Sequence, residues 1–152
     1  MLTLTFAWIG KIDDKEYAGA VRRYVTRIER WARVDEIAVR AERDRSAEAA
    51  GREGRKLLER IPARARVVVL ETGGRMLTTE AFADFLARHR DADPRPLFFV
   101  VGGASGLPES VRRRADEILS LSPMTFPHEI ARLVLVEQIY RALSISAGLR
   151  YH

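Results

Sequence analysis

The sequence predicts a single-domain α/β protein in which helices cover both faces of a parallel sheet. Short apolar segments alternate along the chain with longer segments whose apolar residues recur at helical spacing. This alternation is typical of strand–helix–strand units. Two short segments, 66–70 and 97–101, are apolar without alternation, as expected of strands buried on both faces. A chain of 152 residues is long enough for one domain with a substantial core.

The first part of the chain predicts two strands, each followed by a helix. Residues 2–9 are apolar and β-favouring and end at Gly10, which predicts the first strand. Asp13 or Asp14 is expected to cap the next helix, whose apolar residues return at helical spacing up to Trp31. The expected elements are strand 2–9, helix 17–32, strand 34–39, a polar and mobile loop 40–45, and helix 46–61, which Pro62 ends.

The second part predicts three further strands. Ligands of parallel sheets bind beyond the carboxyl ends of the strands, so the loops after Leu70, Val101 and Leu121 are the candidate binding loops. The expected elements are strand 66–70, a turn 71–77 around Gly73 and Gly74, helix 78–90, strand 97–101, a glycine-rich turn 102–106, helix 108–115, strand 117–121 and helix 128–147.

Composition excludes several classes of function. The chain has no cysteine, so it has neither a thiol nucleophile nor a disulfide framework. Three histidines and no H-E-x-x-H motif argue against a metal site, and no Ser-His-Asp set or paired carboxylate pattern suggests a hydrolase. The longest apolar run is too short to span a bilayer, and the N-terminus does not read as a signal peptide. We expect a soluble cytoplasmic protein without a membrane partner.

The net charge of +5 lies entirely in the first half of the chain. Residues 1–76 hold 17 basic and 12 acidic side chains, whereas residues 77–152 hold nine of each. Of the 26 basic residues 23 are arginine, which favours planar contacts with phosphate but also follows from a GC-rich genome. The balance is compatible with an RNA partner and does not prove one.

Two loops at the expected carboxyl edge of the sheet are unusual. Residues 102–106 hold three glycines, more than a tight turn needs, which favours close approach of a ligand or of another chain segment. Residues 120–128 form a stiff loop with two prolines around Met124-Thr125-Phe126. These apolar side chains are equally compatible with core packing and with a pocket for a flat apolar ligand.

The last helix is apolar on nearly all sides, which predicts that it is covered on more than one side. His128 and Arg132 lie at its N-terminus beside the stiff loop, where a cation and an imidazole suit an anion or an electron-rich group. Glu137 and Arg141 stand four residues apart in the order that favours an ion pair, which we interpret as structural.

The order of the motifs along the chain resembles the RlmH family, the large-subunit rRNA pseudouridine N3-methyltransferases of the SPOUT superfamily. The resemblance covers essentially the whole chain, and its C-terminal motifs are the specific ones. They are G-G-x-x-G-L over 102–107, L-S-L-S-P-M-T-F-P-H over 119–128, R-L-V-L-V-E-Q-I-Y-R-A over 132–142, and a terminal Tyr151-His152.

This resemblance implies one SPOUT domain over 1–152, a trefoil knot over about 97–152, a homodimer and S-adenosylmethionine as methyl donor. The implied activity is N3-methylation of pseudouridine 1915 of 23S rRNA, on the assembled ribosome. No metal is implied. The implied cofactor-binding residues are Leu70, Gly102, Leu121, Ser122, Pro123, Met124, Thr125 and Phe126. The implied catalytic residues are His128, Arg132, Tyr151 and His152, and the expected RNA-binding residues are Lys11, Arg22, Arg23 and Arg150.

One departure from the family pattern concerns the tail. The family usually carries a basic residue after the terminal Tyr-His, and this sequence stops at His152, so Arg150 is the candidate to supply that charge. Two other functions compete with the implied one. A non-catalytic RNA-binding or ribosome-associated protein that keeps the fold would bind little methyl donor. A methyltransferase of the same superfamily would act on another RNA group, such as a ribose hydroxyl.

Overall fold

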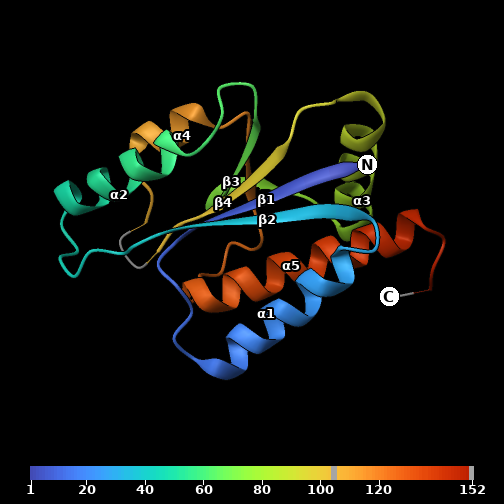
Figure 1. Cartoon of the computed structure of the whole chain (residues 1–152), viewed down its shortest axis with the longest axis horizontal. Coiled ribbons are helices and arrows are strands. Elements are labelled where there is room, and N and C mark those ends of the chain that lie inside the picture. Colours follow the sequence, from blue (N-terminus) through green and yellow to red (C-terminus); the bar gives the residue numbers. More distant parts are fainter. Residues whose placement is uncertain (104–105, 151–152) are drawn as a thin grey trace.

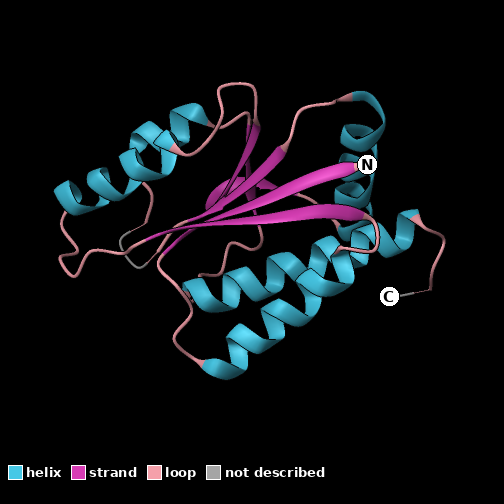
Figure 2. Ribbon diagram, in the orientation of Figure 1, coloured by secondary structure: helices cyan, strands magenta, loops and turns pink. Residues whose placement is uncertain are grey.

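The computed structural model describes residues 1–103 and 106–150. Within these residues, five strands form one sheet in the order β2-β1-β4-β3-β5, and each neighbouring pair is parallel. Helices lie on both faces of the sheet (Figure 1) and alternate with strands along the chain (Figure 2). The predicted α/β class and parallel sheet are confirmed.

The strands are β1 (Leu2–Ile9), β2 (Ala32–Val39), β3 (Arg66–Met76), β4 (Leu97–Val101) and β5 (Glu117–Ser120). The helices are α1 (Lys15–Ile28), α2 (Ala47–Glu59), α3 (Thr79–Ala92), α4 (Glu109–Arg114) and α5 (His128–Ser146).

Two hydrophobic cores lie on opposite faces of the sheet because successive strand side chains point to opposite sides. Val68 of β3 belongs to the core beneath α1, α3 and α5, whereas Val67 and Val69 belong to the core beneath α2 and α4. Phe6 and Phe99 anchor the larger core, with ring centroids 6.2 Å apart. Each fully buried apolar side chain contributes about 1.5–3 kcal/mol, so both helical layers are held against the sheet.

Side-chain caps fix where three of the helices begin. The Asp14 carboxylate accepts hydrogen bonds from the backbone N–H groups of Glu16 and Tyr17. Ser46 and Thr78 cap α2 and α3 in the same way, each accepting from an N–H three residues ahead. These bonds satisfy N–H groups that the helix itself leaves without a partner. Of the two aspartates expected to cap the first helix, Asp14 is the one that does.

The predicted end of the first helix is wrong. Helix α1 ends at Ile28 instead of residue 32, and β2 begins at Ala32 instead of Val34. Trp31 lies in the turn between them, where its ring packs against Tyr140 of α5 at a centroid distance of 5.8 Å. Trp31 follows Ile28 by three residues and contacts the same core, so spacing alone could not separate a helical position from the turn.

The predicted turn over 71–77 is also wrong, because β3 continues to Met76. Pairing with β5 is interrupted between Leu70 and Arg75 and then resumes. A Cβ on Gly74 would lie 2.7 Å from the backbone oxygen of Ile118. Glycine is therefore required here for close approach of two strands, not for a reversal of the chain.

No helix in the described part of the chain is both long and apolar enough to cross a membrane. The trefoil knot over about 97–152 and the single domain over 1–152 stay predictions.

Candidate active site

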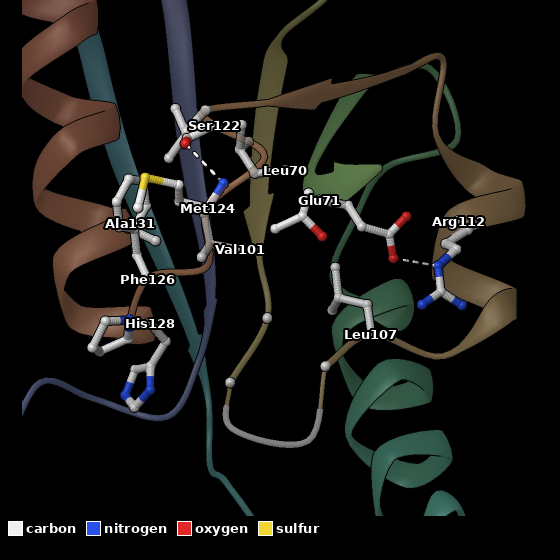
Figure 3. Close-up of a pocket in the computed structure, with 16 residues that line it drawn as sticks. Leu70, Glu71, Val101, Leu107, Arg112, Ser122, Met124, Phe126, His128 and Ala131 are labelled. Atoms are coloured by element: carbon white, nitrogen blue, oxygen red, sulfur yellow. Dashed lines mark hydrogen bonds and ion pairs between the residues drawn. The ribbon is translucent and has the colours of Figure 1, made fainter. Parts of the chain in front are cut away.

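A cavity of about 510 Å³ opens at the carboxyl ends of β4 and β5, beside the part of β3 where its pairing with β4 ends at Leu70 (Figure 3). This is the edge at which parallel sheets bind ligands, and the volume suits a cofactor of nucleoside size. The residues that line it are Leu70, Glu71, Thr72, Val101, Gly102, Gly103, Gly106, Leu107, Arg112, Leu121, Ser122, Met124, Phe126, Pro127, His128 and Ala131.

The wall that follows β4 consists largely of backbone. A Cβ on Gly102 would lie 2.9 Å from Cγ of Leu107, a buried side chain that closes the core beneath α2 and α4. A larger residue at position 102 would therefore displace Leu107 or fill the cavity. The absence of a side chain leaves the Gly102 backbone accessible to a ligand.

The stiff loop between β5 and α5 forms the wall beside α5. The Ser120 hydroxyl donates to the Ser122 carbonyl at 2.9 Å, and the Ser122 hydroxyl accepts from the Met124 N–H at 2.9 Å. Met124 is 74% exposed and Phe126 is 39% exposed. Both line the cavity and neither belongs to a core, so the structure decides between the two interpretations of this loop in favour of a pocket.

Most residues predicted to bind the cofactor lie together. Six of the eight line the cavity: Leu70, Gly102, Leu121, Ser122, Met124 and Phe126. Pro123 and Thr125 belong to the same loop as Ser122 but are not among the residues that line the cavity. The prediction that these segments meet at the carboxyl edge of the sheet was correct. They meet because β3 and β4 are neighbours in the sheet and β3 also pairs with β5.

An ion pair on the opposite wall was not predicted. Nε of Arg112 in α4 donates to Oε1 of Glu71 at 2.5 Å, and this bond raises the pKa of Arg112. Glu71 directly follows a buried stretch of strand at the carboxyl edge, so its position in the sequence was a usable signal. Arg112 stands 41 residues further along the chain, and no spacing rule connects the two residues.

His128 lies in the first turn of α5 and faces the same cavity, on the side of Phe126 and Ala131 in Figure 3. Its imidazole is half-buried. The Glu71–Arg112 pair lies across the cavity (Figure 3). A ligand between the two walls would contact an imidazole on one side and an ion pair on the other.

Arg132 is buried behind the cavity and is not among its lining residues. It is 1% exposed, its Nη2 donates to the Ile9 carbonyl at 2.6 Å, and its guanidinium carbon lies 5.0 Å from the Trp8 ring centroid. Burial lowers the pKa of Arg132 to about 10, so the side chain remains a cation at neutral pH. Any effect of Arg132 on a ligand in the cavity is therefore through charge and through the position of β1.

The predicted RNA-binding residues come from three separate segments of the chain. Lys11 lies in the loop after β1, Arg22 and Arg23 lie on α1, and Arg150 follows α5; all four are exposed. Among the described residues, none of the four lines the cavity. The predicted catalytic residues Tyr151 and His152 lie outside the described residues.

Comparison with known proteins identifies the family. The family model described as "Predicted SPOUT methyltransferase" matches residues 2–152. The chain belongs to the SPOUT methyltransferase family. Within it, the chain is 38% identical over 152 residues to a protein of Geotalea daltonii named ribosomal RNA large subunit methyltransferase H, with 99% of each chain covered. A protein of Gluconacetobacter diazotrophicus with the same name is 42% identical over 144 residues, covering 95% of this chain and 93% of that one. The predicted resemblance to the RlmH family is confirmed.

Two solved structures support this SPOUT methyltransferase fold. A probable methyltransferase from Bordetella pertussis Tohama I matches with a TM-score of 0.60 and 15% identity, covering 92% of this chain and 93% of that one. A probable rRNA-methyltransferase from Porphyromonas gingivalis matches with a TM-score of 0.56 and 13% identity, covering 95% and 69%. At these identities the likeness concerns the fold alone.

Proposed function

We propose that this protein is an S-adenosylmethionine-dependent methyltransferase that methylates N3 of pseudouridine 1915 in 23S rRNA, on the assembled ribosome. The observation that carries the proposal is identity of 38–42% to relatives named ribosomal RNA large subunit methyltransferase H, along nearly the whole of each chain. The cavity supports it, since it lies where the family resemblance places the methyl donor. The same proposal places the protein in the cytoplasm, as a homodimer.

The cavity fits the methyl donor in size and in chemistry. Its volume of about 510 Å³ suits one adenosyl cofactor. Leu70, Leu107 and Phe126 offer apolar surface for a flat ring, and the cradle at Gly102 is one that a Cβ would fill. Leu70, Gly102 and the loop 121–126 would hold the adenosyl part of the donor. When bound, S-adenosylmethionine supplies a methyl group on a positively charged sulfur, already a strong electrophile.

The remaining work of the chain is to orient the base and to remove its proton. N3 of pseudouridine is a weak acid that must lose its proton near the moment of attack, and holding the reactants together supplies much of the rate. We assign His128 as the group in the cavity that takes this proton on its imidazole. Arg132, buried one turn further along α5, stabilises the developing negative charge, and Tyr151 and His152 close over the base.

The decisive experiment measures methyl transfer. Ribosomes and separated subunits from cells that lack this methylation are incubated with the protein and labelled S-adenosylmethionine, and the nucleosides are analysed by mass spectrometry. We expect label in 3-methylpseudouridine at a single position of 23S rRNA. Label on a ribose would support the competing methyltransferase, and no donor binding would support the non-catalytic protein. The Gly102→Leu variant tests the donor site. We expect it to abolish donor binding, because its side chain would occupy the cavity.

A further inference from the structure

Three arginines stand in the loop that follows β2. Arg40, Arg43 and Arg45 are exposed, and no ion pair or side-chain hydrogen bond joins any of them to another described residue. In Figure 1 this loop, coloured cyan, projects from the carboxyl edge of the sheet. Lys11 in the neighbouring loop is likewise exposed and without an ion-pair partner in the described part of the chain.

The two acidic residues of the same loop already have partners. The Glu42 carboxylate accepts from Nε and Nη2 of Arg52, with the shortest contact at 2.7 Å. The Asp44 carboxylate accepts from the N–H and the hydroxyl of Ser46, at 3.1 and 2.7 Å. These bonds lower the pKa of both carboxyl groups. The acids are used to shape the loop, and its unpaired charge is positive.

A buried glutamate holds the loop in place. Glu53 of α2 is 3% exposed, and its carboxylate accepts from the Glu42 N–H at 2.7 Å across 11 residues of sequence. Together with the Ser46 cap, this bond anchors the loop at its middle and at its end. The mobility predicted for residues 40–45 stays a prediction, and these bonds tether the loop to α2.

A continuous series of contacts connects this loop to the cavity. A Cβ on Gly103, which lines the cavity, would lie 3.3 Å from the Ile9 carbonyl. The next residue, Gly10, donates its N–H to the Val39 carbonyl at 2.7 Å, and a Cβ there would lie 3.3 Å from Cβ of Ala41. The loops after β4, β1 and β2 therefore lie side by side along one edge, as the parallel order β4-β1-β2 requires.

We propose that the loop 40–46 is an RNA-binding surface outside the cavity, which holds phosphates of the rRNA strand that runs into the cavity. Arg40, Arg43 and Arg45 would grip phosphate oxygens, with Lys11 between them and the cavity. Arginine suits this task because its planar fork binds phosphate through two hydrogen bonds. Such contacts position RNA without reading its sequence. The inference rests on the proposed function and adds the three arginines of the loop to Lys11, which was already expected to bind RNA.

The test compares two charge-matched double variants. Arg43→Ala/Arg45→Ala removes two cations from the loop. Arg64→Ala/Arg88→Ala removes two exposed arginines that lie away from it, one before β3 and one on α3. Binding of each protein to naked 23S rRNA transcribed in vitro, and to large ribosomal subunits, is measured over a series of salt concentrations. Donor affinity and thermal unfolding are measured in parallel.

We expect the loop variant to bind both RNA probes about tenfold more weakly, with a slope of log K against log salt shallower by about two. The control variant, donor affinity and thermal stability should stay close to wild type. Equal binding by the two double variants would overturn the inference. So would a loss confined to subunits and absent with naked rRNA, because it would assign the loop to a ribosomal protein. Methyl transfer by the wild type tests the proposed function separately, since binding is read without it.

A second variant separates the position of the loop from its charge. Glu53→Ala makes the protein more positive, so charge alone predicts tighter RNA binding. If the loop must be held at the carboxyl edge, Glu53→Ala binds naked 23S rRNA more weakly, and Glu53→Gln, which keeps an oxygen acceptor, restores part of the affinity. Tighter binding by a folded Glu53→Ala protein would show that loop position is irrelevant.

Discussion

His89 of α3 shows how burial sets the chemistry of one side chain. It is 1% exposed, its Nε2 lies 2.9 Å from the Arg95 carbonyl, and its Nδ1 lies 3.3 Å from Nη1 of Arg66. The neutral ring satisfies both neighbours by donating from Nε2 and accepting at Nδ1. Burial lowers the pKa of His89 below 6.5.

This lowered pKa predicts a loss of stability in mild acid. Below about pH 6.5 the unfolded chain takes up a proton on His89 while the folded chain does not, so the free energy of unfolding falls as pH falls towards the folded-state pKa. We expect the unfolding temperature of wild type to drop more than that of His89→Gln between about pH 8 and about pH 5. Asp93 does not titrate in this window, because Arg95 holds its pKa far below the usual range. Parallel pH profiles would contradict the prediction.

Substitution of Arg132 is expected to lower both stability and activity, because its buried guanidinium donates to a backbone carbonyl. Arg132→Ala leaves the Ile9 carbonyl without its charged donor and the nearby Glu129 carboxylate without its cation. We expect the free energy of unfolding to fall by about 2–3 kcal/mol, and methyl transfer to be lost. Arg132→Lys keeps the cation and should recover part of both. Denaturant titration measures the first effect and labelled transfer the second. Full transfer by a folded Arg132→Ala protein would remove Arg132 from the mechanism.

The sequence predicted which residues meet at the site better than it predicted which way they point. Leu70 ends the apolar run 66–70, and Gly102 and Leu121 directly follow β4 and β5, so the topology of a parallel sheet was enough to bring them together. Arg132 was placed correctly on α5, but helical spacing fixes only a face of the helix and not the partner that the side chain reaches. Arg112 could not be paired with Glu71, because only the folded sheet brings α4 beside Glu71 of β3.

At the scale of elements, glycines mark where strands approach each other. Gly73 and Gly74 read as a turn in the sequence, since a turn and a close strand contact require the same lack of a side chain. The contact of Gly74 with β5 lies across more than 40 residues of chain and has no local signal. The boundary between α1 and β2 was missed for a related reason. Trp31 would pack on the same core whether it lay in a helix or, as it does, in the turn after α1.

Gly74 therefore predicts the cost of separating β3 from β5. A Cβ there would lie 2.7 Å from backbone atoms of Ile118 and Leu119, which cannot move without opening the strand pair. We expect Gly74→Ala to lower the free energy of unfolding by about 1–3 kcal/mol. Donor affinity should fall as well, because β5 leads directly into the loop 121–126.

Gly51 provides the control for this substitution. It lies within α2 with nothing near its missing Cβ, so Gly51→Ala should raise the free energy of unfolding by about 0.5–1 kcal/mol. Denaturant unfolding and donor titration compare the two proteins. If both variants had the same free energy of unfolding, the close contact of Gly74 with β5 would not contribute to stability as we predict.

At the scale of the whole molecule, the carboxyl edge of the sheet concentrates the chemistry. The cavity, His128 at the start of α5 and the loop 40–46 lie along this edge, which carries the loops after β2, β4 and β5. In the proposed function, this edge both holds the donor and meets the RNA. The proposed homodimer would place a second copy of the chain against the remaining surface of α5.

That second copy has a defined expected contact on α5. Ile130 and Val134 are half-buried and belong to neither core, and the half-buried Glu137–Arg141 ion pair continues the same face of the helix. In the proposed homodimer this face is covered. Val134→Glu would place a carboxylate in that dry contact, so we expect it to sediment as a monomer and Val134→Ala to remain a dimer. The unfolding temperature of wild type should also rise with protein concentration, as for any folded dimer that unfolds to single chains. A wild-type protein that sediments as a monomer at every concentration tested would refute the homodimer while leaving the cavity and its chemistry intact.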